Sequence, residues 1–257
     1  MSHNRYINPE IIRYTPKSSD PLPIDTHIYA FDLDHTIIQP KNPKAIFAKG
    51  PNDWKFMEFE ENDPTLNTLI KICQDDPLAQ IVIFTNQGGV ITVPSTSKSC
   101  NNFTQKVENI FKCIATQPSG DLLLKRMWLY SSTMKPAALF PKKNKKNQNK
   151  KNSVSKQSTL SFIKNVKPAD QEDGGAATPT EDLEALFNSM RKPCTGMADQ
   201  FIRDICERND TITKENIDWI YYCGDAAGRK TDFSDTDKQF AEKLGIDFKF
   251  PEEVFKN

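Results

Sequence analysis

The sequence lacks the features that would assign it at once to several large classes of protein. Its six cysteines are spread over 257 residues and form neither a Cys-x-x-Cys pair nor a cluster with zinc-site spacing. They are typical of the reduced thiols of an intracellular protein. No apolar run approaches the length that spans a membrane, and the N-terminus lacks the apolar segment of a signal peptide. We therefore expect a soluble nuclear or cytosolic protein, and by default a monomer.

Charge is balanced overall but distributed unevenly along the chain. The formal net charge is zero, so global charge does not indicate a nucleic-acid partner. Residues 1–26 are polar and hold four prolines, which predicts an N-terminal arm over the core or a loose tail. Residues 135–189 are lysine-rich and of low complexity, with the run KKNKKNQNKKN. Because such a composition cannot bury a core, we expect a disordered insertion there.

The two remaining parts, 27–134 and 190–257, show alternating apolar and amphipathic segments. We predict strands at 28–33, 79–84, 122–131, 217–223 and 248–250, and helices at 63–75, 101–114, 195–208 and 235–244. This alternation predicts one α/β domain with a doubly wound, mostly parallel sheet. Residues 39–60 contain Pro, Gly and aromatic residues, which indicates a flap-like loop or hairpin; it either covers a substrate or packs as a surface loop.

Two carboxylates follow the first predicted strand, at Asp32 and Asp34. Residues two apart on a strand point to the same side, and ligands of open α/β sheets bind at the carboxyl ends of the strands. One carboxylate could therefore attack an electrophile and the other could carry a proton, or both could hold Mg²⁺. The alternative is a solvated loop after a strand, with Thr36 bracing the turn.

Polar clusters recur at three further points of the predicted domain, two of them after strands. The full set is Asp32-x-Asp34-x-Thr36, Thr85-Asn86, Lys192 within Arg191-Lys192-Pro193, and Gly224-Asp225. In this order the set resembles the haloacid-dehalogenase (HAD) superfamily of aspartate-based phosphotransferases. The resemblance covers roughly residues 28–131 and 190–255, and it implies a HAD-like Rossmannoid fold.

The resemblance also implies a role for each residue. Asp32 attacks phosphorus and forms an aspartyl-phosphate, while Asp34 acts as the general acid and then as the base. Thr85, Asn86 and Lys192 bind the phosphate, and Thr85 and Lys192 assist catalysis by holding a phosphoryl oxygen and neutralising charge.

The metal that the resemblance implies is Mg²⁺, held by Asp32, by Asp34 through its backbone carbonyl, and by Asp225. Three further acids follow Asp225 closely. Asp232, Asp235 and Asp237 are interpreted as residues that cap and solvate the next helix, with the outer shell of the metal as the alternative.

Longer segments narrow the resemblance. RKPCTGM at 191–197 is similar to a segment shared by histidinol-phosphate, heptose-bisphosphate and polynucleotide 3′-phosphatases, while GDAAGR at 224–229, DFS at 232–234 and FTNQ at 84–87 resemble the polynucleotide kinase 3′-phosphatase family. The zinc loop usual in the sugar-phosphatase relatives has no counterpart here. His35 stands where many relatives have Gly, in a position where we expect its side chain to point away from the acids. No Gly-x-x-x-x-Gly-Lys-[Ser/Thr] loop exists, so we expect a stand-alone phosphatase without a 5′-kinase domain.

The resulting hypothesis is a Mg²⁺-dependent phosphatase that hydrolyses 3′-phosphates at DNA strand breaks to 3′-hydroxyls, in DNA repair. The expected substrate is a single-stranded or frayed 3′ end, with Arg229, Lys230 and Lys49 as candidate contacts to its backbone. The alternatives are a small-metabolite phosphatase of the same branch and an inactive module that binds DNA ends.

The lysine-rich insertion has its own hypotheses. It is a nuclear localisation signal, a non-specific DNA tether or a solvated linker, and we expect a nuclear protein. The segment from Gln157 to Ile163 loosely resembles a peptide that binds a sliding clamp, although its aromatic spacing departs from the usual one.

Overall fold

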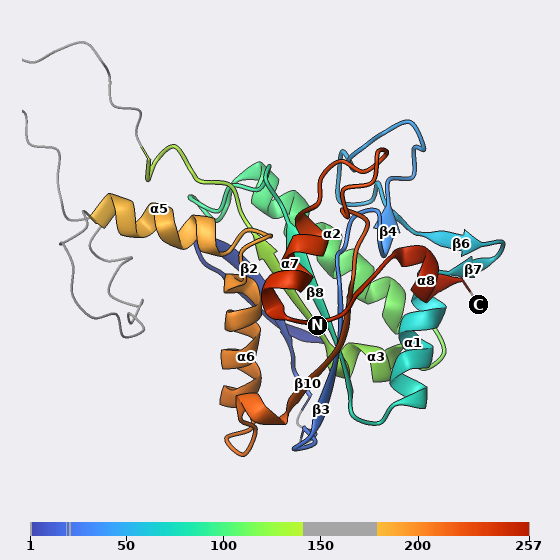
Figure 1. Cartoon of the computed structure of the whole chain (residues 1–257). Coiled ribbons are helices and arrows are strands. Elements are labelled where there is room, and N and C mark those ends of the chain that lie inside the picture. The colour runs from blue at the N-terminus through green and yellow to red at the C-terminus, as the bar shows by residue number, and fades with distance from the viewer. Residues whose placement is uncertain (1, 19, 21, 141–178, 257) are drawn as a thin grey trace, which may run out of the picture.

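The computed structural model describes residues 2–18, 20, 22–140 and 179–256 (Figure 1). In this part of the chain a seven-stranded sheet has the order β1-β2-β9-β8-β3-β10-β11. Its parallel part consists of β9 (Met127–Ser132), β8 (Ala79–Asn86), β3 (Thr26–Phe31), β10 (Ile217–Cys223) and β11 (Phe248–Lys249). The prediction of a doubly wound, mostly parallel α/β sheet is confirmed.

Helices cover both faces of the sheet, and β8 shows why the sheet is apolar throughout. Its successive side chains alternate between two cores: Ile81 and Ile83 face one, Val82 and Phe84 the other. The first core is closed by α1 (Thr65–Asp75), α2 (Lys98–Ala115), α3 (Gly120–Arg126) and α8 (Pro251–Phe255), and the second by α6 (Gly196–Arg208) and α7 (Thr236–Leu244). Each fully buried aliphatic or phenyl side chain contributes about 1.5–3 kcal/mol.

The N-terminal segment, expected as an arm or a tail, instead extends the sheet. β1 (His3–Ile7) and β2 (Ile11–Pro16) form an antiparallel hairpin, and β2 pairs with β9. Arg13 forms an ion pair with the buried Asp204 of α6, whose other oxygen accepts a hydrogen bond from Tyr130 at 2.8 Å. His3 is also buried, and its Nε2 donates to the Met127 carbonyl at 2.8 Å. These contacts fix the hairpin to the domain.

Three element boundaries differ from the prediction. Residues 122–126, expected as the start of a strand over 122–131, lie in α3, because a short apolar run such as Leu122–Leu123–Leu124 suits a helix as well as a strand. α1 begins at Thr65, after Asp63–Pro64 has formed the short strand β7 opposite β6 (Glu58–Glu60). Residues 179–189, expected in the disordered insertion, form α5 (Pro179–Ser189), and the ring of Phe187 packs on Phe140.

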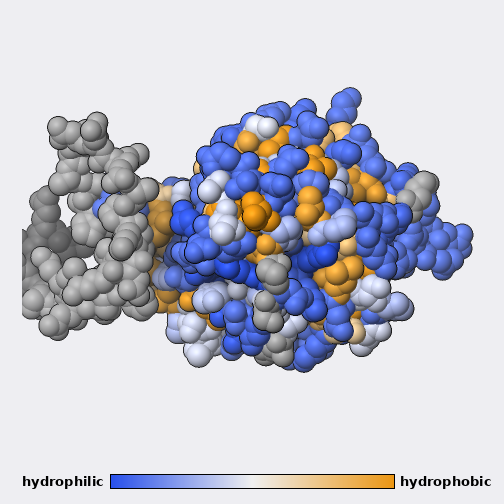
Figure 2. Space-filling view, turned by 90° about the horizontal axis from the view of Figure 1, so that it is seen from below, coloured by the Kyte–Doolittle hydropathy of each residue, from blue (hydrophilic) through white to orange (hydrophobic). Residues whose placement is uncertain are grey.

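Residues 135–140 of the expected insertion are described, and Lys135 donates to Glu184 of α5 at 2.8 Å. Residues 141–178 lie outside the described residues, and so does the segment from Gln157 to Ile163. Among the helices that the structure describes, none is both long and apolar enough to cross a membrane. One face of the molecule is largely hydrophilic, with hydrophobic side chains gathered in several small groups (Figure 2).

Residues 40–54 form a flap loop that leaves and re-enters the domain through the pairing of β4 (Ile38–Gln39) with β5 (Lys55–Phe56). Trp54 anchors the base of the flap, since it is buried and its ring packs edge-on against Phe56. At the tip Ile46 and Phe47 are exposed. The flap tip lies beside the loop that follows β10 (Figure 1), so the flap both packs on the domain and reaches over the carboxyl edge of the sheet.

Candidate active site

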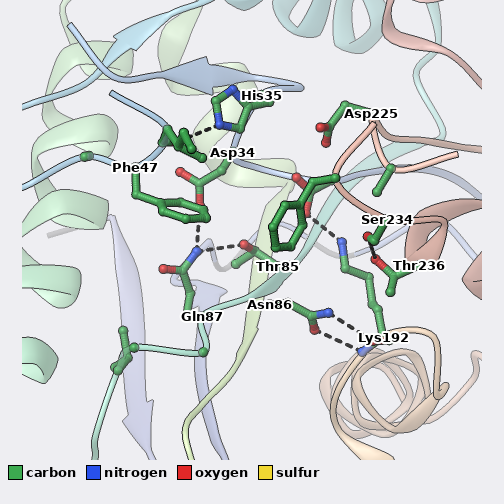
Figure 3. Close-up of a pocket in the computed structure, with 18 of the residues that line it drawn as sticks. Asp34, His35, Phe47, Thr85, Asn86, Gln87, Lys192, Asp225, Ser234 and Thr236 are labelled. Carbon is green, nitrogen blue, oxygen red and sulfur yellow. Dashed lines mark hydrogen bonds and ion pairs between the residues drawn. The ribbon is translucent and has the colours of Figure 1, made fainter. Parts of the chain in front are cut away.

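A pocket of about 910 Å³ opens at the carboxyl ends of β3, β8 and β10. It is lined by the ends of these strands, the flap residues 46–50, one face of α2, and the loop that leads from β10 to α7. Each polar cluster singled out in the sequence contributes at least one residue to its wall (Figure 3). The expectation that Thr85 lies beside Asp32 follows from the parallel pairing of β3 with β8.

Asp32 and Lys192 meet on the floor of the pocket. Lys192 is 3% exposed, and its three N–H groups donate to Asp32 Oδ1 at 2.6 Å, Asp237 Oδ1 at 2.7 Å and the Tyr222 hydroxyl at 2.8 Å. The Tyr222 hydroxyl in turn donates to Asp237 Oδ1 at 3.0 Å. The Lys192 ammonium is therefore saturated by protein acceptors and holds Asp32 in one orientation.

The electrostatics of this group follow from its burial. Burial raises the pKa of Asp32 well above its usual range; Lys192 acts against this rise and the neighbouring carboxylates add to it. Burial alone would lower the pKa of Lys192, but the charges of Asp237 and Asp32 outweigh it and raise that pKa. Lys192 therefore stays charged and compensates one carboxylate.

Three carboxylates, those of Asp32, Asp225 and Asp237, lie close enough to hold a metal ion, with one oxygen of each within 4.8 Å of the others. Burial and then the charge of Asp237 raise the pKa of Asp225 to about 6. Lys192 balances only one of the three negative charges, so a divalent cation could neutralise the two that remain. Mg²⁺ prefers such oxygen ligands. The donor set therefore fits the predicted metal.

The three acids are not equivalent as metal ligands. Both oxygens of Asp237 are already used, because Oδ1 binds Lys192 and Oδ2 accepts the Ala226 backbone N–H at 3.0 Å. No other residue in the described part of the chain donates a hydrogen bond to the Asp225 carboxylate, which points into the pocket (Figure 3). Asp225 and Asp32 are thus the acids of this group that keep a carboxylate oxygen for a metal. The Asp34 carboxylate lies outside this group.

Asp34 is held by two other side chains. Gln87 Nε2 donates to Asp34 Oδ2 at 2.7 Å and to Thr85 Oγ1 at 2.9 Å (Figure 3). Lys106 of α2 donates to Asp34 Oδ1 at 3.2 Å. Since Thr85 Oγ1 accepts the bond from Gln87, its own hydroxyl proton is left for another acceptor; the role predicted for Thr85 stays a prediction.

The other predicted residues have different surroundings. Asn86, whose binding to phosphate stays a prediction, lines the pocket and exchanges two hydrogen bonds of 3.0 Å with the backbone N–H and carbonyl of Lys192. Its amide therefore fixes the segment that carries Lys192. His35 has a φ of +64°, a conformation that favours Gly. Its side chain, expected to point away from the acids, lines the pocket, and Nε2 donates to the Ile46 carbonyl of the flap at 2.7 Å.

The three residues predicted to contact DNA differ in their position relative to the pocket. Arg229 lines the pocket, but its Nε donates to Asp232 at 2.9 Å and its guanidinium lies over the Phe250 ring at 4.6 Å. Lys49 lines the pocket at the base of the flap tip, whereas Lys230 is exposed and outside the lining. The DNA contacts stay predictions.

The sequence analysis missed Lys106, and its interpretation of Asp237 as a residue that caps and solvates the next helix is wrong, because Asp237 is buried and pairs with Lys192 at 2.7 Å. Helical spacing carries a signal for both residues. Asp237 precedes the buried Phe240 and Ala241 by three and four residues, so it lies on the buried face of α7. Lys106 stands three residues after the buried Phe103 and is likewise on the inner face of α2. A charge on an apolar helix face is the pattern that marks both.

The sheet order, the Asp-x-Asp turn at the end of β3 and the acids after β10 define a hydrolase of the HAD superfamily. Residues 27–255 match the family described as polynucleotide kinase 3 phosphatase, and the chain belongs to this family.

Its relatives include the polynucleotide 3′-phosphatase of Saccharomyces cerevisiae, 41% identical over 99% of both chains. The protein of the same name from Saccharomyces mikatae is 42% identical over 100% of this chain and 97% of its own length. A bifunctional polynucleotide phosphatase/kinase of Schizosaccharomyces pombe is 27% identical over 88% of this chain but only 36% of its own length. The family resemblance found in the sequence is confirmed.

Proposed function

We propose that this protein is a Mg²⁺-dependent DNA 3′-phosphatase, which removes the terminal phosphate at strand breaks and leaves the 3′-hydroxyl that DNA repair requires. The observation that carries the proposal is the set of acids in one pocket: Lys192 holds Asp32, the open Asp225 lies close to Asp32, and Gln87 holds Asp34. The family membership and the two closely similar relatives support a polynucleotide as the substrate.

The residues divide the reaction between them. Asp32, which Lys192 orients through Oδ1, attacks the phosphorus atom with one carboxylate oxygen and leaves the other to the metal. As the bond from phosphorus to the sugar oxygen breaks, Asp34 gives that oxygen a proton. Asp34 then takes a proton from the water that releases phosphate from Asp32. Thr85 donates its hydroxyl proton to a phosphoryl oxygen throughout.

The metal would be held by Asp32 and Asp225, and when bound it supplies the positive charge that lets two anions approach each other. The role of Asp237 is to keep Lys192 in place, since both of its oxygens are engaged.

Features of the pocket mouth support a nucleotide strand as the ligand. Phe47 of the flap and Phe233 of the loop after β10 are 63% and 86% exposed. Their rings pack edge-on, with 6.5 Å between the ring centroids. Exposed aromatic rings of this kind stack on nucleobases regardless of sequence. Within the described residues, the pocket-lining Lys49 and Arg191 side chains have no ion-pair partner, so both are available to backbone phosphates.

The remaining proposals concern the setting of the enzyme. A nuclear location is supported by the lysine-rich run, which also suits a DNA tether. A monomer remains our proposal for the oligomeric state, and the segment from Gln157 to Ile163 remains a proposed clamp-binding peptide.

The proposal is tested with a single-stranded oligonucleotide that carries a 3′-phosphate. Phosphate release is measured with Mg²⁺ and with EDTA, for the wild type and Asp32→Asn, beside histidinol phosphate and a sugar phosphate. We expect release from the oligonucleotide, only with Mg²⁺ and only by the wild type. Faster turnover of either small phosphate would replace the proposal by a metabolite phosphatase, and no turnover of any substrate would leave a binding module.

A further inference from the structure

Lys106 is a buried cation that the reaction described above does not use. It lies on the inner face of α2 and is 7% exposed, with its ammonium 5.6 Å from the centre of the Phe103 ring. Its one hydrogen-bond acceptor among the described residues is Asp34 Oδ1, at 3.2 Å. Burying an ammonium is costly unless a negative charge compensates it. The placement of Lys106 is therefore matched to the Asp34 carboxylate.

Each carboxylate oxygen of Asp34 accepts a hydrogen bond from another side chain. Lys106 binds Oδ1 from α2, and Gln87 binds Oδ2 at 2.7 Å from the loop after β8. The terminal torsion of an aspartate is broad when nothing restrains it. Two donors from opposite sides remove this freedom, and Gln87 is itself fixed by its second bond to Thr85 at 2.9 Å. The plane of the Asp34 carboxylate is set by Lys106 and Gln87 together.

We propose that Lys106 is a positioning residue for departure of the leaving group, acting through Asp34. This inference rests on the proposed function, in which Asp34 protonates the sugar oxygen. In that step the bond from Asp32 to phosphorus forms and the bond from phosphorus to the sugar oxygen breaks. The proton moves from Asp34 to the departing oxygen, and Asp34 becomes a carboxylate facing the Lys106 ammonium. Lys106 thus stabilises the charge that develops as the proton leaves.

If Lys106 acts through Asp34, the effect of replacing it on kcat/KM should depend on the leaving group. A sugar alkoxide departs only with a proton, whereas p-nitrophenolate departs without one. We therefore compare kcat/KM, which reports the steps up to departure of the leaving group, for three substrates: p-nitrophenyl phosphate, thymidine 3′-monophosphate and a 3′-phosphorylated oligonucleotide.

For Lys106→Met we expect a decrease of roughly 30-fold or more on both sugar phosphates and of less than about threefold on p-nitrophenyl phosphate, since a positioned acid contributes 10²–10⁴-fold. Lys106→Arg keeps a cation at this place and should recover part of the loss. Lys112→Met is the matched control, because Lys112 is exposed on the same helix and outside the pocket lining.

Each other outcome overturns the inference. An equal loss on all three substrates would assign Lys106 to phosphate binding or to folding, which the melting temperature of the variant distinguishes. A loss confined to the oligonucleotide would make Lys106 a contact to the strand, and no loss at all would deny it any role. Failure of the proposed function has another signature, because the wild type would then turn over the oligonucleotide no faster than the small phosphates.

Discussion

Two aspartates of the site carry the same charge in opposite settings, and replacing each by asparagine should change stability in opposite directions. Asp225 faces other carboxylates and receives no hydrogen bond from another residue in the described part of the chain, whereas Asp237 is an ion-pair partner of the buried Lys192 at 2.7 Å. In protein freed of metal, Asp225→Asn removes a repulsion and should stabilise the fold. Asp237→Asn removes an attraction and should destabilise it.

The magnitude for Asp225 follows from its pKa. The raised pKa, about 6 against an ordinary value of 3.8, means that the folded state binds this proton more tightly than the unfolded chain. The penalty for ionising Asp225 is therefore absent below the unfolded value, grows as the pH rises and is complete above about pH 6. A rise of the Asp225 pKa from 3.8 to about 6 corresponds to at most about 3 kcal/mol, and partial exposure to solvent reduces the expected gain of Asp225→Asn to about 1–2 kcal/mol.

The magnitude for Asp237 follows from the cost of breaking a buried ion pair, about 3–5 kcal/mol. Asp32 remains as a second partner of Lys192 at 2.6 Å, so the lower end of this range applies to Asp237→Asn. For a chain of this size each kcal/mol moves the melting temperature by about 2–4 °C.

The assay is urea unfolding near neutral pH in EDTA, repeated with excess Mg²⁺. Mg²⁺ should raise the stability of the wild type, by about 2.7 kcal/mol at a hundred times the dissociation constant, and leave Asp225→Asn unchanged. If the two variants shift stability in the same direction in EDTA, or if Asp225→Asn still responds to Mg²⁺, the assignment of the three acids is wrong.

Three further predictions test other parts of the structure. Burial lowers the pKa of His3 from 6.5 to about 4, so the free energy of unfolding should fall by up to about 3 kcal/mol as the pH drops from about 6.5 to about 4. In urea unfolding across this range, the free energy of unfolding of His3→Gln should depend less on pH than that of the wild type. Tyr130→Phe deletes the hydrogen bond to Asp204, the residue that also pairs with Arg13 of the N-terminal hairpin, and should lower the free energy of unfolding in urea by about 1–2 kcal/mol. An unchanged unfolding midpoint would show that the attachment of the hairpin does not depend on this bond. Phe47→Ala should raise KM for a 3′-phosphorylated oligonucleotide about tenfold through lost stacking and leave p-nitrophenyl phosphate unaffected, and an equal effect on both would argue against a base-stacking role.

The parts of the fold that the sequence predicts well are those in which one local pattern decides. The buried strands β3, β8 and β10 are apolar runs that end in polar residues, and their parallel order follows from the helices between them. The N-terminal hairpin has no such pattern, because its proline-rich polar sequence becomes a sheet edge only through contacts with β9 and α6. α3 is a second case, since a run of three leucines does not distinguish a helix from a strand.

The site likewise contains residues that a local sequence pattern predicts and residues that only the packing of the helices brings in. Motifs next to strand ends place Asp32, Thr85 and Asp225 in one pocket. The partners that orient the acids come from helix faces distant in sequence, and which acid such a residue meets depends on the packing of its helix. Lys106 and Asp237 are charges on otherwise apolar helix faces, so the sequence marks them as unusual without naming what each one contacts.

The account depends most directly on phosphate transfer to Asp32. The decisive measurement is a single-turnover reaction with an oligonucleotide radiolabelled in its 3′-phosphate, in Mg²⁺, quenched with acid within milliseconds and followed by peptide mapping. The account predicts a transient labelled peptide that contains Asp32, absent from Asp32→Asn. Release of labelled phosphate by the wild type without any labelled protein at early times, or label on a peptide that lacks Asp32, would contradict it.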